Sequence, residues 1–133
     1  MTNIEYCSPT QCELLKASGF DWETDAYYTN EDAPEHHFWI VPDKTMNYND
    51  GSAGLLTMSA PTLYYAAKWL REVHGADIVV SPRFDSNTGD RIGYFWRWSQ
   101  RTDVKDENSY ESFEDALSAG IDAVIEPFKI LLQ

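Results

Sequence analysis

The sequence predicts an α+β fold, a single domain over residues 1–133 in which antiparallel hairpins pack against helices in the order α-β-β-α-β-β-α. Three observations support this prediction. Residues 59–74 have helical periodicity with cap signals at both ends. Two β-rich runs, 78–81 and 92–99, flank a polar turn, and a third segment from residue 113 onward repeats apolar residues at helical spacing.

A short helix is predicted first, opened by Ser8-Pro9-Thr10 and ended by Gly19, with Cys12, Leu14 and Leu15 as its apolar positions. Residues 9–16 align without a gap over residues 61–68, and each copy then reaches a Gly-x-Asp sequence. An internal repeat is one interpretation of this similarity. Shared cap chemistry in two unrelated helices is the other.

Residues 26–29 and 37–41 are rich in aromatic and β-branched side chains and are predicted to form an antiparallel pair of strands. Polar turn formers that include Pro34 separate them. Residues 42–58 are predicted to be a long polar connection, with a tight turn at Asn49-Asp50-Gly51-Ser52 beside a marginal third strand.

The helix at residues 59–74 is expected to be the centre of the fold. Ser59 is its predicted N-cap, Pro61 lies in its predicted first turn, and Gly75 is expected to close it in the left-handed conformation. At 100° per residue, one arc of this helix carries the apolar set Leu63, Ala66, Ala67, Trp69, Leu70, Val73 and His74. That arc is predicted to face the core.

The strands at 78–81 and 92–99 are predicted to form a hairpin around the polar loop 85–90. Alternation along the second strand places Phe95 and Arg97 on one face, and on the other face the set Ile92, Tyr94, Trp96 and Trp98. The aromatic face is predicted to pack on the helices. Residues 101–111 are predicted to be a charged loop.

Ser112 is the predicted N-cap of the last helix, whose apolar stripe runs from Phe113 to Phe128. Gly120 lies within that stripe, which predicts a close approach of the helix to the sheet. Pro127 removes one helical hydrogen bond and disfavours a helical conformation at Glu126. The helix is therefore predicted to end or kink there.

Composition excludes several classes of protein. The chain has 22 acidic and 10 basic residues, a formal charge of −12, which argues against a non-specific binder of phosphate backbones. No apolar run approaches the ~20 residues of a membrane span, and the first residues lack a basic, apolar leader, so a cytoplasmic location without membrane contact is expected. Cys7 and Cys12 lack a second pair at zinc spacing. No cofactor is expected.

Three segments, 15–21, 59–75 and 110–117, resemble a family of small uncharacterised proteins from Bacteroides-type gut bacteria and their prophages. The matching pieces are Leu15-Lys16-Ala17-Ser18-Gly19-Phe20-Asp21, Ser59-Ala60-Pro61-Thr62 with Lys68-Trp69-Leu70-Arg71-Glu72-Val73-His74-Gly75, and Tyr110-Glu111-Ser112-Phe113-Glu114-Asp115-Ala116-Leu117. These pieces are helix caps and core faces. The resemblance implies a bacterial cytosol and a mobile genetic element, and it brings no catalytic residue or ligand.

Two arrangements that would carry metal or acid-base chemistry do not fit their motifs. In the loop 85–90, Asp85, Asn87 and Asp90 offer oxygen ligands, but Asp90 stands where a calcium loop needs Gly, and Trp96 stands where it needs Glu. The histidines His36, His37 and His74 have no neighbouring nucleophile in the sequence. A small hydrolytic enzyme remains an alternative if one of them meets a carboxylate in a pocket.

Two binding alternatives remain open. Tyr94, Trp96 and Trp98, with Arg83, Arg91 and Arg97 nearby, would form a stacking platform for single-stranded nucleic acid if they were exposed. The acidic amino half would instead present carboxylates to a basic partner, and it could do so as a nucleic-acid mimic that inhibits a host enzyme. The carboxylates concerned are Asp21, Glu23, Asp25, Glu31, Asp32 and Glu35.

The sequence therefore predicts a non-catalytic accessory or interaction protein of a bacterial or prophage genome. Its interaction surface is predicted on the loops or on the outer sheet face near Arg83, Phe95 and Arg97. A protein partner is favoured over nucleic acid because the net charge repels phosphate.

Overall fold

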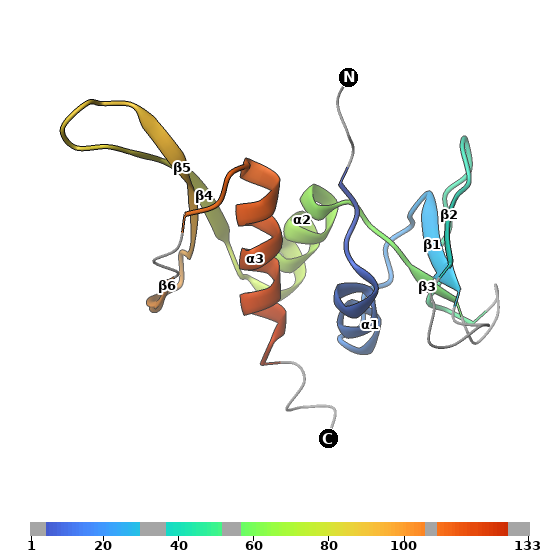
Figure 1. Cartoon of the computed structure of the whole chain (residues 1–133). Helices are drawn as coiled ribbons and strands as arrows, with labels where there is room; N and C mark the ends of the chain where they lie inside the picture. The colour runs from blue at the N-terminus through green and yellow to red at the C-terminus, as the bar shows by residue number, and fades with distance from the viewer. Residues whose placement is uncertain (1–4, 30–36, 52–56, 106–108, 128–133) are drawn as a thin grey trace.

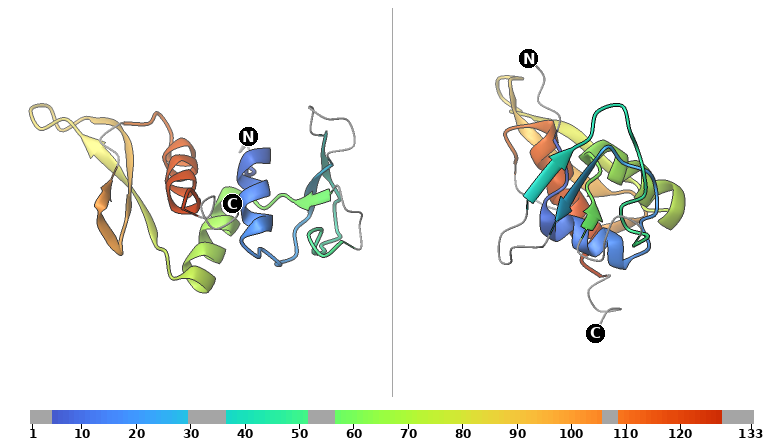
Figure 2. Two further views of the ribbon diagram at one scale, coloured as in Figure 1. Left: turned by 90° about the horizontal axis from the view of Figure 1, so that it is seen from below. Right: turned by 90° about the vertical axis from the view of Figure 1, so that its right-hand side faces the viewer.

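Helices separate two three-stranded antiparallel sheets in the computed structural model, which describes residues 5–29, 37–51, 57–105 and 109–127 (Figure 1). One sheet lies at each end of the molecule, with the helices between them (Figure 2). The predicted α+β class and element order are confirmed, with additional strands. Along the chain the elements are α1 (Pro9–Ala17), β1 (Ala26–Thr29), β2 (His37–Ile40), β3 (Thr57–Ser59), α2 (Leu63–His74), β4 (Ile78–Phe84), β5 (Arg91–Trp98), β6 (Arg101–Lys105) and α3 (Phe113–Ile125).

The first helix and hairpin form as predicted. The Ser8 side chain accepts the backbone N–H of Gln11, and the Gln11 side chain accepts the backbone N–H of Ser8, so that a capping box opens α1. The helix ends beside Gly19, whose φ is 99°. β1 then pairs with β2 on one edge and with β3 on the other, giving the order β2-β1-β3.

The start of the central helix differs from the prediction. Thr62, not Ser59, is the N-cap of α2, and its hydroxyl accepts the backbone N–H of Tyr65 at 3.2 Å. Ser59 ends β3 instead, and its hydroxyl accepts the backbone N–H of Tyr48 at 3.0 Å. Pro61 therefore precedes the N-cap, whereas Pro9 is the first residue of α1. In the alignment of the two segments, the N-caps of the two helices therefore fall at different positions, which weakens the interpretation as an internal repeat.

Residues 101–105, predicted to lie in a loop, form β6 at the edge of the second sheet, whose order is β4-β5-β6. A short turn at Ser99 and Gln100 brings Arg101 opposite Trp98 and Lys105 opposite Arg97. Charged residues are common on edge strands because they discourage pairing with other chains. The polar composition that predicted a loop is thus compatible with an edge strand.

The core lies between α3, the β4–β5–β6 sheet and the other two helices. α3 packs against β4, β5, α2 and α1. Leu63, Ala66, Trp69 and Leu70 of α2 are buried as predicted, but Val73 and His74 are exposed. Both lie in the last turn of α2, and the ring of His74 packs edge-on against Trp69 with centroids 4.7 Å apart.

Two further predictions concern the ends of the second hairpin and of α3. Ile92, predicted to pack on the helices, is 55% exposed, because the tip of the hairpin extends past α3 (Figure 1). α3 ends at Ile125, just before Pro127, as predicted. The segment after Pro127 lies outside the described residues. Within the described residues, no helix has the length and apolar composition that crossing a membrane requires.

Candidate binding surfaces

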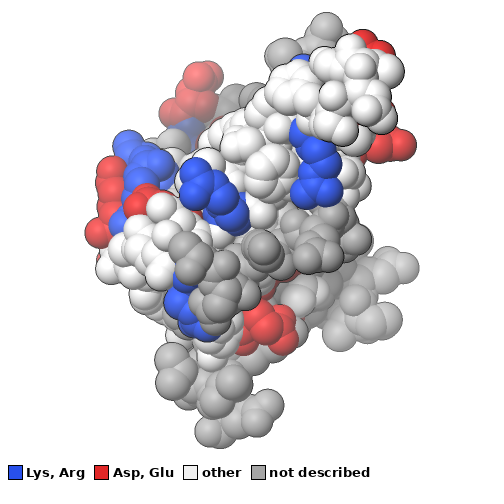
Figure 3. All heavy atoms as spheres, turned by 90° about the vertical axis from the view of Figure 1, so that its left-hand side faces the viewer, with Lys and Arg blue, Asp and Glu red and all other residues white. Residues whose placement is uncertain are grey.

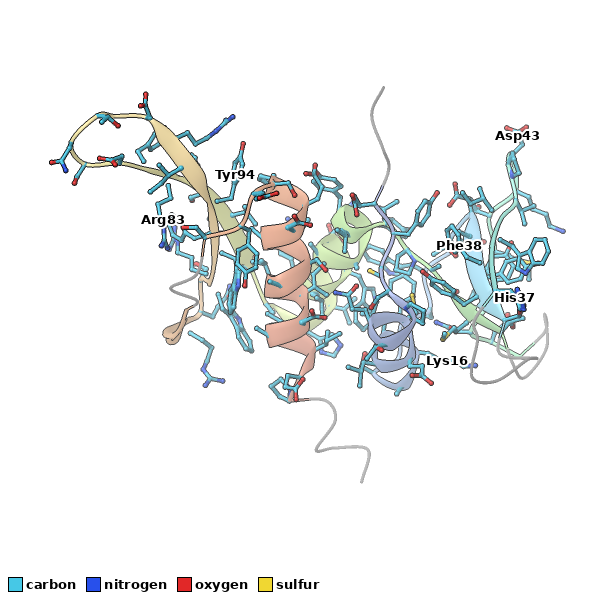
Figure 4. The ribbon with its side chains drawn as sticks, in the orientation of Figure 1. Lys16, His37, Phe38, Asp43, Arg83 and Tyr94 are labelled. Carbon is cyan, nitrogen blue, oxygen red and sulfur yellow. The ribbon has the colours of Figure 1, made fainter. Side chains whose placement is uncertain are left out.

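The outer face of the β4–β5–β6 sheet, opposite α3, carries the predicted interaction residues. Strand pairing sets Val79 opposite Arg97 and Ser81 opposite Phe95, so these residues share one face with Arg83. The Arg83 guanidinium lies over the Phe95 ring, 5.0 Å from its centroid. Figure 4 shows Arg83 on the side of the strands away from α3 and Tyr94 on the side toward it. We call the set Val79, Ser81, Arg83, Phe95 and Arg97 the outer sheet face.

The charge of the chain is strongly segregated around this sheet. Residues 78–105 contain five of the 10 basic residues and three of the 22 acidic residues, a net charge of +2 against −14 for the remainder of the chain. Seen from this side, Lys and Arg side chains lie among uncharged residues, with Asp and Glu side chains beside some of them and toward the margins (Figure 3). The sheet is thus a weakly positive region on an acidic molecule, which favours contact with an acidic surface.

The inner face of the same sheet is not available for stacking. Trp96 is 5% exposed and lies under Gly120 of α3, and Tyr94 packs edge-on against Phe113. Trp98 is half-buried against the core, with the Arg101 guanidinium 5.3 Å from its ring centroid. The central ring of the predicted platform for single-stranded nucleic acid is therefore buried and not exposed for stacking.

The 85–90 loop uses its polar groups to shape a turn. Asp85 Oδ1 accepts the backbone N–H groups of Asn87 and Thr88 at 2.7 and 3.2 Å, and Thr88 Oγ1 accepts that of Asp90. Among the described residues, no group of three His, Cys, Asp or Glu side chains is arranged to hold a metal ion.

The thiols and histidines do not converge on a pocket in the described part of the chain. Cys7 and Cys12 are fully buried, and burial raises the pKa of both thiols well above the ordinary value. His37 is exposed on β2, and His74 is exposed at the end of α2. His36 lies outside the described residues.

A second region combines carboxylates with aromatic rings, between α2 and the segment that leads into β1. A cavity of about 380 Å³ is bordered by Glu23, Asp25, Thr45, Thr62 and Tyr65. A neighbouring cavity of about 480 Å³ is bordered by Asp21, Trp22, Glu23, Tyr65, Lys68 and Glu72. Glu23 and Tyr65 border both, so the two depressions adjoin. We call these two adjoining depressions together the acidic groove.

Hydrogen bonds hold two of its carboxylates in place. The Tyr6 hydroxyl donates to Asp25 Oδ1 at 3.3 Å, and the Thr45 hydroxyl donates to Glu23 Oε2 at 3.1 Å. Burial and the Glu23 charge together raise the pKa of Tyr65. Tyr65 therefore stays a neutral phenol in contact with a negative environment.

The sequence predicted only part of this groove. Asp21, Glu23 and Asp25 were predicted as acidic contacts, and in the structure Glu23 borders both depressions, Asp21 the larger one and Asp25 the smaller one. Tyr65 and Glu72 were not predicted as part of it, because they belong to α2, which is distant in the sequence. Trp22 was not predicted either, although it lies between Asp21 and Glu23. Of the predicted acidic set, Glu31, Asp32 and Glu35 lie outside the described residues.

The β2 strand exposes large apolar side chains at the far end of the molecule. Trp39 is 52% exposed and Ile40 is 50% exposed, whereas Phe38 is partly covered by Tyr6 and Tyr28, each with its ring centroid 5.0 Å away. β2 is an edge strand of its sheet. Figure 4 shows Phe38 and Arg83 at opposite ends of the molecule.

Comparisons with family models, with curated proteins and with solved structures give no match to this chain. The resemblance to proteins of gut bacteria and their prophages therefore stays a prediction. Functional inference rests on the surfaces described above.

Proposed function

We propose that the chain is a non-catalytic interaction protein that binds a protein partner through the outer sheet face. The stack of Arg83 on Phe95 is the observation on which this proposal rests. The half-buried ring of Phe95 lies between the side chains of Arg83 and Arg97, on the sheet face opposite α3. Aromatic and arginine side chains are enriched among the residues that dominate binding energy in protein interfaces.

The charge distribution supports an acidic protein surface as the partner. Residues 78–105 carry a small positive charge, and the rest of the chain carries −14. A long nucleic acid would meet that negative field over much of its length, whereas a compact acidic patch would contact the sheet alone. The same proposal includes a location in the bacterial cytoplasm and an origin in a bacterial or prophage genome.

Pull-down with matched variants tests this function. Tagged wild-type protein and the variants Arg97→Glu and Arg71→Glu are incubated with lysate of the organism that encodes the chain, with nuclease, at low and high salt. Arg97 and Arg71 are both exposed, but Arg71 lies on α2, away from the outer sheet face. We expect one set of proteins to be retained by wild type and by Arg71→Glu and lost by Arg97→Glu.

Other outcomes contradict the proposal. Loss of all binding after nuclease treatment would show that nucleic acid mediates the contact. Equal loss with both variants would show a response to net charge and not to this face. A third variant, Phe95→Ser, separates specific contact from charge, because it keeps the formal charge and removes the ring on which Arg83 stacks.

A further inference from the structure

The acidic groove has the features of a site for a cationic side chain. Among the described residues, its border carries four carboxylates, Asp21, Glu23, Asp25 and Glu72, and a single cationic residue, Lys68. These carboxylates attract a cationic group that enters the groove, and salt weakens the attraction because the groove is open to solvent. An anionic ligand would be repelled by the same arrangement.

Aromatic rings give the groove a second recognition element. Trp22 and Tyr65 contact each other with ring centroids 5.1 Å apart, and both border the larger cavity with Glu23 and Glu72. Trp22 is half-buried, so that part of its surface faces the solvent-filled space. Indole and phenol rings attract cations placed over their faces.

We infer that the acidic groove binds an arginine side chain from a basic segment of a protein partner. A guanidinium group is planar, stacks on aromatic faces, and donates several hydrogen bonds to carboxylates in one plane. The larger depression of the groove offers both kinds of contact, from its rings and from its carboxylates. This site is separate from the outer sheet face, and the inference does not depend on the function proposed for that face.

Lysine and metal ions fit the groove less well. A lysine ammonium is a compact, strongly hydrated charge that gains less from stacking on rings than guanidinium does. A divalent metal ion requires several oxygen ligands within a coordination sphere, and no group of three such side chains is so arranged among the described residues. The carboxylates of the groove are spread along its border instead.

Peptide titration tests the site. An acetylated, amidated tetra-arginine peptide is titrated into the full-length protein at low salt, and binding is measured by calorimetry. Tetra-lysine and tetra-glutamate peptides are titrated in parallel. We expect the tetra-arginine peptide to bind more tightly than the tetra-lysine peptide and the tetra-glutamate peptide not to bind. The affinity for the cationic peptides is expected to fall as the salt concentration rises.

Four variants locate the binding. Glu23→Gln removes the carboxylate shared by both cavities and is expected to weaken tetra-arginine binding about fivefold. Lys68→Gln removes the competing cation and is expected to strengthen it about threefold. Trp22→Leu is expected to reduce the preference for arginine over lysine. Glu13→Gln, an exposed carboxylate of α1 that borders neither cavity, is expected to leave the affinity unchanged.

The variants also give the outcomes that would overturn the inference. Equal weakening by Glu23→Gln and Glu13→Gln would mean that peptide affinity depends on the net charge of the protein alone. An unchanged affinity in Lys68→Gln would mean that the peptide binds outside the acidic groove. A thermal melt of each variant confirms folding. The Arg97→Glu variant of the outer sheet face is expected to bind tetra-arginine as well as wild type does, so the two proposals fail or succeed separately.

Discussion

Gly120 of α3 lies so close to Ile78 of β4 that a Cβ atom at this glycine would stand 2.7 Å from Ile78 Cγ2. It would also stand 3.3 Å from Cβ and Cγ of Trp96. The missing side chain thus sets the distance between the last helix and the sheet. This contact closes the inner face of that sheet, whereas the opposite face carries the half-buried Phe95 and the exposed Arg97.

Replacement of Gly120 by Ala is therefore expected to destabilise the fold. Alanine is favoured over glycine within a helix by about 1 kcal/mol, but overpacking of a core costs about 1–3 kcal/mol. We expect a net loss in the free energy of unfolding, measured by urea denaturation. In an Ile78→Ala background the clash is removed, so Gly120→Ala is expected to be neutral or stabilising there. An equal loss in both backgrounds would contradict the packing account.

Gln11 links α1 to α3 through its buried side-chain amide. Its Nε2 donates to Asp122 Oδ1 at 2.8 Å and to the hydroxyl and carbonyl oxygens of Ser118 at 3.1 and 3.2 Å. Replacement by Leu leaves these acceptors without that donor and is expected to cost about 2 kcal/mol of unfolding free energy. The loss is measured by chemical denaturation at pH 7.

Gln11→Glu sharpens this prediction, because it places a second carboxylate beside Asp122. We expect Gln11→Glu to be less stable than Gln11→Leu at pH 7 and the difference to shrink toward pH 4, where the introduced carboxyl gains a proton and donates again. A constant difference between the two variants across this pH range would show that charge repulsion is not the cause.

Most of the fold was predictable where the signal is local. Ser8, Gly19, Gly75 and Ser112 mark helix ends through hydrogen bonds or backbone conformations that involve near neighbours. The predictions fail where a segment distant in the sequence determines the local structure. Ser59 has the chemistry of a cap, but pairing with β1 draws it into β3. The polar segment 101–105 becomes a strand because β5 offers an edge.

The candidate surfaces show the same distinction. Alternation along β5 was sufficient to place Phe95 and Arg97 on one face, and strand pairing sets Arg83, predicted near them, on the same face. The acidic groove required the tertiary structure, because Glu23 meets Tyr65 and Glu72 only after α2 packs beside the segment that leads into β1. A run of acidic residues in the sequence does not indicate which of them will share a cavity.

Alkaline pH is expected to destabilise the protein through buried groups around Cys7. The Tyr28 hydroxyl donates to the Cys7 carbonyl oxygen at 2.9 Å, and burial, with the nearby thiols of Cys12 and Cys7, raises the pKa of Tyr28 to about 12. The folded state thus keeps the neutral phenol, while the unfolded chain loses this proton near pH 10. Stability contributed by this group is complete below pH 10 and is lost as the pH rises toward 12.

The raised thiol pKa values of Cys7 and Cys12 act in the same direction, from about pH 8.5 upward. Tyr28→Phe therefore provides the specific test. This variant loses the hydrogen bond to Cys7, about 1 kcal/mol at pH 7, but its urea midpoint is expected to fall less steeply than that of wild type between pH 10 and 12. Both thiols remain in the variant, so a shallower decline isolates the phenol. Parallel declines would assign the alkaline loss to other groups with raised pKa values, which include the two thiols and Tyr65.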